Sequence, residues 1–274
     1  MNSAVFCHYI PAKNPFLLTL SRWIIRQYGD DPQILTKALI LLPNRRACRG
    51  LREAFLEASQ GNPLLLPRIQ PIGDMEEPST WLYGDAELLQ DIPPAMPDTR
   101  RLLLLTRLIM QFEKLRLGRP YHIAMAAELA RGLAEFMDET AREGITLDRL
   151  DALVPETLAT HWQQTLEFLR IISYYWPTIE QAEGAIGSAA RRRAIILAVA
   201  KRWQHKVPDY PIIAAGSTGS QPATAKLLSV IARLPHGKVI LPGIDLSMPE
   251  REWEELGETH PQYGFTQLLH IMEF

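Results

Sequence analysis

The sequence predicts an α/β protein whose parallel sheet carries an inserted set of helices. Short apolar runs of strand length occur near both ends of the 274-residue chain. Segments with helical periodicity follow these runs, and this alternation is typical of βαβ units and parallel sheets. Between residues 98 and 204 almost every segment has helical periodicity, and no strand pattern interrupts it.

Composition and charge narrow the class of protein. Apolar residues at 47% and charged residues at 22% are typical of a globular protein with one large domain or two ordinary ones. A net charge of −2 means that any contact with DNA must be local. Two cysteines, Cys7 and Cys48, are too few for a disulfide framework, a four-cysteine zinc site or an iron–sulfur cluster held by this chain alone. We therefore expect a reducing cytoplasm, and we expect neither a signal peptide nor a membrane span, since no apolar run approaches about 20 residues.

The first predicted unit is a strand over residues 4–10, a loop, and a helix over residues 16–28. P-loop proteins hold phosphate in a loop at this place. Here the loop is Pro11, Ala12, Lys13, Asn14 and Pro15. It contains one lysine and no glycine, and its two prolines remove two N–H donors that a phosphate needs. We interpret it as an ordinary connection between a strand and a helix.

A second strand is predicted over residues 35–43, and Asn44 then caps a helix that begins RRACRGLR. Arg45, Arg46, Arg49 and Arg52 gather along one side of that helix. Arginines on a helix usually form a solvated face. Their position after a strand end keeps contact with DNA open as the alternative.

A third strand is predicted over residues 64–72, followed by an acidic, proline-rich linker over residues 75–97. Helices are expected near residues 100–117, 124–142, 158–176 and 189–203, the third of them stopped by Pro177. We therefore place the α/β core in residues 1–97 and 205–274, and the helical insertion in residues 98–204.

Aromatic and acidic side chains in the helical insertion can each have a structural or a ligand-binding role. Tyr174, Tyr175 and Trp176 are expected to pack a helix end into the core, although exposed aromatic rings can also stack on bases. Asp138, Glu139 and Glu143 are interpreted as a solvated helix end rather than a divalent metal site, because no histidine or further carboxylate lies nearby in sequence. The seven histidines have no paired ligand spacing, so the sequence places no metal site.

The clearest βαβ unit spans residues 211–245, with an apolar run at 212–213, a helix over 222–234 and a strand over 239–241. Its first loop, GSTGS, falls at the carboxyl end of a parallel strand, where open α/β sheets bind their ligands. The loop lacks the lysine of a phosphate loop, because Ser220 follows Gly219 and the next lysine is Lys226. It also departs from the G-x-S-x-G pattern of serine hydrolases.

The last predicted helix lies within residues 259–274. Its apolar residues need a partner surface: Phe265, Leu268, Leu269 and Met272. We expect the chain to belong to something longer.

Five ordered segments resemble the amino-terminal region of AddB, the double-strand break repair subunit, in its alphaproteobacterial form. They are LILLPNRRACRGLREAFLE (39–57), LLLPRIQPIGD (64–74), RRLLLLTRLI (100–109), PIIAAGSTGSQPATAKLLSVIARLPHGKVILPGID (211–245) and HPQYGFTQLL (260–269). The resemblance implies a P-loop NTPase, RecA-like core similar to domain 1A of superfamily 1 helicases, with a 1B-like helical insertion. It also implies a bacterial, cytoplasmic protein that associates with the nucleoid when on DNA.

The resemblance also implies partners and a missing part. AddB pairs with AddA, an active helicase–nuclease, and the pair resects broken DNA ends for homologous recombination. A carboxy-terminal nuclease domain of AddB holds an iron–sulfur cluster where one is present. The chain ends well before such a domain, so we expect this fragment to have no nuclease activity and no cofactor.

The helicase-like site departs from the pattern of active motors. Residues 11–15 take the place of the phosphate loop, and AAGSTGSQ stands roughly where active helicases carry a glycine–aspartate and a glutamine. Without the phosphate-binding lysine, ATP hydrolysis loses its main electrostatic stabilisation, so ATP binding is not expected.

We therefore expect a scaffold and channel for single-stranded or broken duplex DNA. In this interpretation Arg45, Arg46 and Arg49 contact phosphates, and Ser217, Thr218 and Ser220 line the edge of the channel. One alternative is an enzyme that binds a nucleotide or small phosphorylated substrate at GSTGS. The other is a purely structural domain that contacts its partner and no nucleic acid.

Overall fold

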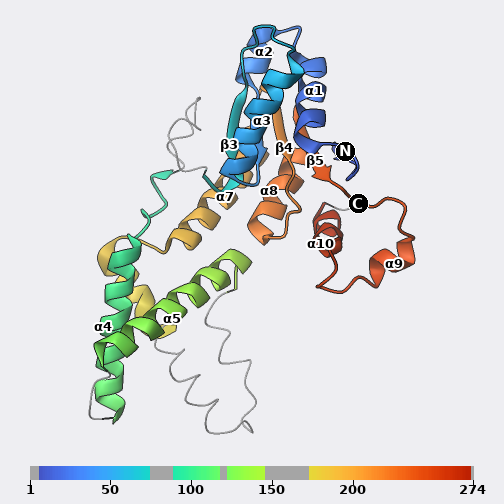
Figure 1. Cartoon of the computed structure of the whole chain (residues 1–274). Coiled ribbons are helices and arrows are strands. Elements are labelled where there is room, and N and C mark those ends of the chain that lie inside the picture. The colour runs from blue at the N-terminus through green and yellow to red at the C-terminus, as the bar shows by residue number, and fades with distance from the viewer. Residues whose placement is uncertain (1–5, 75–88, 118–121, 146–172, 273–274) are drawn as a thin grey trace. The chain divides into compact units, whose positions relative to one another are not determined.

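The computed structural model describes residues 6–74, 89–117, 122–145 and 173–272 (Figure 1). The chain divides into two compact units: residues 1–86 with 195–274, and residues 87–194. We call them the α/β unit and the helical unit. The sequence pattern sets the corresponding boundaries at residues 98 and 204. The boundary between residues 194 and 195 falls within helix α7 (Ser188–His205).

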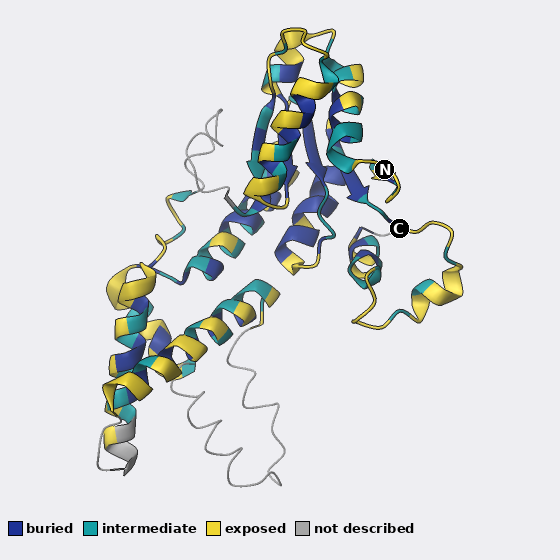
Figure 2. Cartoon of the chain, in the orientation of Figure 1, coloured by how far each residue is buried: buried dark blue, intermediate teal, exposed yellow. Residues whose placement is uncertain are grey.

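Five strands in the described residues form one sheet, and every pair of neighbours is parallel. The strands are β1 (Cys7–Ile10), β2 (Leu39–Leu42), β3 (Arg68–Pro71), β4 (Ile212–Ala215) and β5 (Gly237–Pro242). Their order is β1-β5-β4-β2-β3. All residues of β2 and β4 are buried, as expected of strands covered on both faces (Figure 2). The predicted α/β class with a parallel sheet is confirmed.

Helices cover the two faces of the sheet. On one face α1 (Phe16–Tyr28) packs against α3 (Arg45–Ala58), and their apolar side chains share a core with Ile40 and Ile213. Helix α8 (Pro222–Arg233) packs on β4 and β5. The β2-to-β3 and β4-to-β5 connections run in opposite directions along the sheet, so right-handed crossovers place α3 and α8 on opposite faces.

Two predicted strands are too long. Residues 35–37 belong to helix α2 (Pro32–Lys37), because the Asp31 side chain accepts the backbone N–H groups of Gln33 and Ile34 and so caps a helix start. The prediction merged the end of this helix with β2, because residues 35–42 are mostly apolar. Residues 64–67 precede β3 rather than form part of it, and a 3₁₀ turn, Ile72–Asp74, follows β3. Residues 4–5 of the first predicted strand lie outside the described residues.

The helical unit contains α4 (Asp98–Leu117), α5 (Ile123–Glu143), a helical segment over residues 173–183 and the start of α7. Its core includes Leu105, Leu133 and Trp176. The predicted helix stop at Pro177 is wrong, since helical structure continues to residue 183. Proline has a helical φ, and its main cost in a helix is one lost hydrogen bond and a steric contact. The predicted helical residues 158–172 and linker residues 75–88 lie outside the described part.

The chain itself supplies the partner surface that the last helix requires. Helix α10 (Tyr263–Ile271) packs on α8, and it follows the short helix α9 (Glu250–Glu254). Phe265, Leu268 and Met272 are buried, whereas Leu269 is half-buried. None of the described helices is long and apolar enough to cross a membrane.

Candidate functional site

The topological switch point of the sheet lies between β2 and β4. These strands are neighbours, but β2 leads outward to β3 while β4 leads the other way to β5. Ligands of open α/β sheets bind at this point, beyond the carboxyl ends of the strands. The loops after β2 and β4 lie against each other there, because a Cβ built on Gly216 would be 3.6 Å from Cδ of Pro43. The switch point therefore unites two segments that are far apart in sequence.

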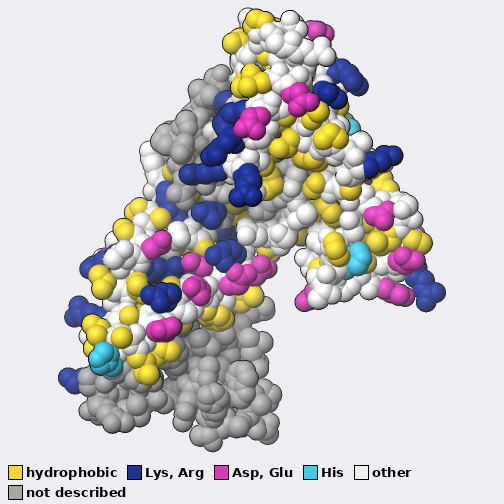
Figure 3. Space-filling view, in the orientation of Figure 1, with side chains coloured by type: hydrophobic (Ala, Val, Ile, Leu, Met, Phe, Trp, Pro, Cys, Tyr) yellow, Lys and Arg dark blue, Asp and Glu magenta, His cyan; other side chains and the backbone are white. Residues whose placement is uncertain are grey.

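Helix α3 begins at the switch point and carries the candidate arginines. The Asn44 side chain accepts the Ala47 N–H at 2.9 Å, which fixes the helix start. One face of α3 is buried in the core, so Arg45, Arg46 and Arg49 are exposed on the other. Figure 3 shows Lys and Arg side chains gathered over α3.

The position of these arginines is not explained by helix stability. A helix start carries partial positive charge, so a nearby cation there is unfavourable by about 0.3–1 kcal/mol. A bound anion reverses that balance, because backbone N–H groups and guanidinium groups then face the same negative charge. The arginines therefore add no stability through the helix dipole, and a bound anion would offset their unfavourable position.

The GSTGS loop forms the other side of the switch point. Gly216 and Gly219 have φ values of 77° and 67°, which favour glycine. The Ser217 hydroxyl accepts the Gly219 N–H at 3.2 Å. Ser217 and Thr218 are half-buried and Ser220 is exposed, so the three candidate residues differ in access to a ligand.

Helix α10 covers part of the GSTGS loop. A Cβ on Gly219 would lie 2.8 Å from Cδ1 of Leu268, and a Cβ on Gly264 would lie 3.7 Å from the Thr218 side chain. One sequence signal pointed toward this contact, namely an apolar helix that needs a partner surface. It did not indicate that the partner is the candidate ligand loop.

The loop of residues 11–15 follows β1, which is separated from β2 in the sheet by β5 and β4. It is a tight turn in which the Asn14 N–H donates to the Pro11 carbonyl at 3.0 Å. Ala12 packs on Gly243, and the Phe16 ring packs on Gly216. Lys13 is exposed. The backbone therefore closes on itself instead of surrounding an anion.

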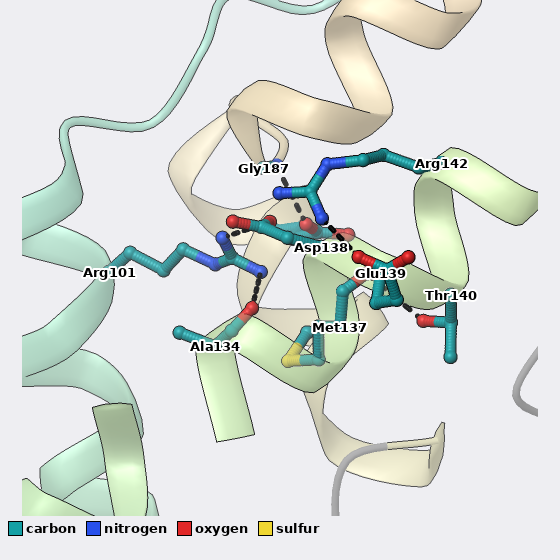
Figure 4. A network of polar contacts seen from close by, with 9 residues as sticks. Arg101, Ala134, Met137, Asp138, Glu139, Thr140, Arg142 and Gly187 are labelled. Atoms are coloured by element: carbon teal, nitrogen blue, oxygen red, sulfur yellow. Dashed lines mark hydrogen bonds and ion pairs between the residues drawn. The ribbon is translucent and has the colours of Figure 1, made fainter. Parts of the chain in front are cut away.

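Asp138 is not a solvated helix end, and that prediction is wrong for this residue. Its carboxylate accepts a hydrogen bond at 2.5 Å from Arg101, whose side chain is 5% exposed (Figure 4). Arg101 also donates to the Ala134 carbonyl at 3.4 Å. Glu139 pairs with Arg142. Among the described residues, no group of three or more His, Cys, Asp or Glu side chains is arranged to hold a metal ion.

The three aromatic residues of the helical unit behave differently. Trp176 is buried, as predicted, whereas Tyr174 and Tyr175 are 76% and 52% exposed. The tyrosine rings meet edge to face with centroids 5.1 Å apart. The packing prediction is therefore wrong for the tyrosines, because consecutive residues of a helix point in different directions.

Two titratable groups on β1 have shifted pKa values. Burial raises the pKa of the Cys7 thiol to about 11, so the thiolate is rare. Burial, and then the charge of Lys238, lower the pKa of His8.

Comparison with known proteins adds no relative, because no protein-family model and no curated protein matches the chain.

Proposed function

We propose that this chain is a non-catalytic, helicase-like part of an AddB-type subunit, and that it binds DNA at the switch point of its sheet. The resemblance of five ordered segments supports the family, and the parallel α/β core is compatible with a RecA-like, P-loop-derived domain. The observation that carries the DNA-binding proposal is the exposed set Arg45, Arg46 and Arg49 at the start of α3.

Binding of this kind is electrostatic and independent of sequence. Guanidinium groups form paired hydrogen bonds with phosphate oxygens, and each neutralised phosphate releases counterions. The Ser220 hydroxyl and the backbone of the GSTGS loop can donate to a neighbouring phosphate. The role of the domain is then to hold a single strand or a broken end while an AddA-type helicase–nuclease subunit acts on it in the bacterial cytoplasm.

The core does not need to hydrolyse ATP for this role. Residues 11–15 form a closed turn with prolines at both ends, and the exposed Lys13 is their single cation. The competing enzyme hypothesis places a small phosphorylated ligand at GSTGS. That hypothesis has less support, because Leu268 packs against Gly219 and α10 covers that side of the loop.

The test is a fluorescence titration of a labelled single strand at two salt concentrations, with ATP binding measured in parallel. We expect Arg45→Glu with Arg46→Glu to weaken binding at least tenfold. The slope of log affinity against log salt concentration should fall by about the amount that two phosphate contacts contribute. The matched control is Arg22→Glu with Arg26→Glu, which makes the same charge change at exposed positions of α1. We expect the control to change affinity by less than about threefold.

Two results would contradict the proposal. One is equal loss of affinity in the α3 and α1 variants, which would show that only total charge matters. The other is magnesium-dependent ATP binding without DNA binding, which would favour a working nucleotide site.

A further inference from the structure

A second surface of the α/β unit has the opposite charge from α3. A groove of about 720 Å³ lies between the segment after β5 and helix α10. Its apolar lining comes from both walls and includes Ile244, Leu246, Trp253, Leu256 and Leu269. Glu250 and Glu254 of α9 also line it. We call this surface the acidic groove.

The walls of the acidic groove are held together by specific hydrogen bonds. The Gln262 amide donates to the Gly243 carbonyl at 3.1 Å and accepts the Asp245 N–H at 3.1 Å. The Asp245 carboxylate accepts the Ser247 hydroxyl and N–H at 2.6 and 2.9 Å, and these bonds lower its pKa. The groove is therefore preformed, which reduces the entropy that a ligand must overcome.

The apolar lining is accessible to a partner. Leu246 is 62% exposed, and Trp253, Leu256 and Leu269 are half-buried. Large exposed apolar side chains that share one groove mark an interaction site more often than scattered ones do. Trp253 supplies an aromatic anchor of the kind that dominates protein interfaces.

The charge around the groove selects the partner. Residues 244–272 contain six carboxylates and one arginine, a net charge of −5 with neutral histidines, whereas the whole chain has a net charge of −2. Acidic side chains gather around α9 in Figure 3. DNA is excluded from such a surface by repulsion of its phosphates, and a basic protein segment is attracted.

We propose that the acidic groove binds a basic amphipathic helix of a partner protein. The apolar stripe of that helix packs on Leu246, Trp253 and Leu269, and its Lys or Arg side chains pair with Glu250 and Glu254. The proposal goes beyond DNA binding and stands independently of it, because the groove and the α3 arginines lie on different elements. A subunit with both surfaces holds DNA and a protein partner by opposite charges.

The probe is a fluorescein-labelled synthetic helix with leucine at helical spacing and lysine at the other positions. Its counterpart replaces every lysine by glutamate. Anisotropy titrations with the full 274-residue chain compare the wild type with Glu250→Lys/Glu254→Lys and with the exposed control pair Glu128→Lys/Glu135→Lys on α5. Leu246→Asp is a third variant. Leu246 is exposed, so we expect this substitution to leave the fold intact.

We expect the lysine helix to bind the wild type at least tenfold more tightly than the glutamate helix. The α9 charge reversal should remove that preference, Leu246→Asp should weaken binding at least tenfold, and the α5 control should leave affinity within about threefold. Circular dichroism establishes that each variant is folded.

Three results would overturn the proposal. They are absence of saturable binding to the lysine helix, equal binding of both helices, and equal weakening by the α5 control. Analytical sedimentation tests whether the groove instead binds a second copy of this chain. A wild-type dimer that Leu246→Asp dissociates would assign the groove to self-association and overturn the proposal.

Discussion

Gly219 joins the GSTGS loop to the last helix through backbone conformation and close contact. Its φ of 67° disfavours any side chain, and a Cβ would lie 2.8 Å from Leu268. We expect Gly219→Ala to lower the free energy of unfolding by about 2 kcal/mol, from backbone strain and displacement of Leu268. Urea denaturation measures the change.

A matched glycine separates the two causes. Gly61 has a φ of 82°, and apart from its chain neighbours no atom of the described residues lies within 4 Å of its Cβ position. Gly61→Ala should therefore cost only the conformational part, about 1 kcal/mol. Equal losses at both positions would mean that the contact with Leu268 contributes nothing.

Arg101 is a buried cation of the helical unit, and its pair with Asp138 should contribute more to stability than a surface pair. We expect Arg101→Met to lower the free energy of unfolding by about 2–3 kcal/mol, less than a fully buried pair because Asp138 keeps some access to water. The side chains of the Arg142 and Glu139 pair are 38% and 64% exposed. Arg142→Met should therefore cost below about 1 kcal/mol, and a larger loss than for Arg101→Met would contradict this ranking.

Cys7 should react slowly with thiol reagents, because its pKa is raised to about 11 by burial. At about pH 8 we expect alkylation in the folded chain to be roughly a hundredfold slower than in urea, where the pKa is about 8.5. The unfolded chain loses the Cys7 proton first, so this residue should lower stability progressively as pH rises from about 8.5 to 11. Site-resolved mass spectrometry measures the rate, and rapid native alkylation at pH 8 would contradict the burial.

At the scale of elements, α10 is attached to α8 through its last carbonyl groups. Arg233 donates to the Met272 carbonyl at 2.9 Å and to the Ser229 carbonyl at 3.0 Å. The Ser229 hydroxyl lies 3.4 Å from the Ile271 carbonyl. Side chains that satisfy the carbonyls of a helix end stabilise that end, and here they also hold the helix that covers the GSTGS loop.

Removal of this attachment should loosen α10. We expect Arg233→Met to speed amide hydrogen exchange in residues 263–272 about tenfold, since hydrogen bonds from a charged group contribute about 1.5 kcal/mol or more. Arg251→Met is the control, because Arg251 pairs with Glu255 on the exposed surface of α9. Unchanged exchange in α10 of the Arg233 variant would show that apolar packing alone fixes the helix.

At the scale of the whole molecule, the two units have separate cores. Ile40, Phe55 and Ile213 belong to the α/β core, whereas Leu105, Leu133 and Trp176 belong to the helical core. Chains with several cores commonly unfold in more than one step.

Calorimetry should therefore resolve two transitions. We expect Arg101→Met to lower only the transition of the helical unit, and Gly219→Ala to lower only that of the α/β unit. A single transition that both variants shift equally would show that the chain unfolds as one cooperative body.

Local sequence determined the class of the protein and several of its elements. The periodicity of residues 16–28 predicted α1 with the bounds observed, and Asn44 marked the start of α3. These features depend on neighbouring residues, because helix periodicity and capping act within one or two turns. The candidate residues Arg45 and Ser220 could be chosen for the same reason, since each follows the end of an apolar run.

Only the tertiary structure decided which of these segments meet. Strand pairing placed β2 beside β4 and so brought α3 and the GSTGS loop to one switch point, although some 170 residues of chain separate them. Packing likewise buried Arg101 against Asp138 and placed Leu268 over Gly219. Such contacts depend on burial summed over the whole fold, and no local pattern encodes the partner of a strand, an ion or an apolar helix face.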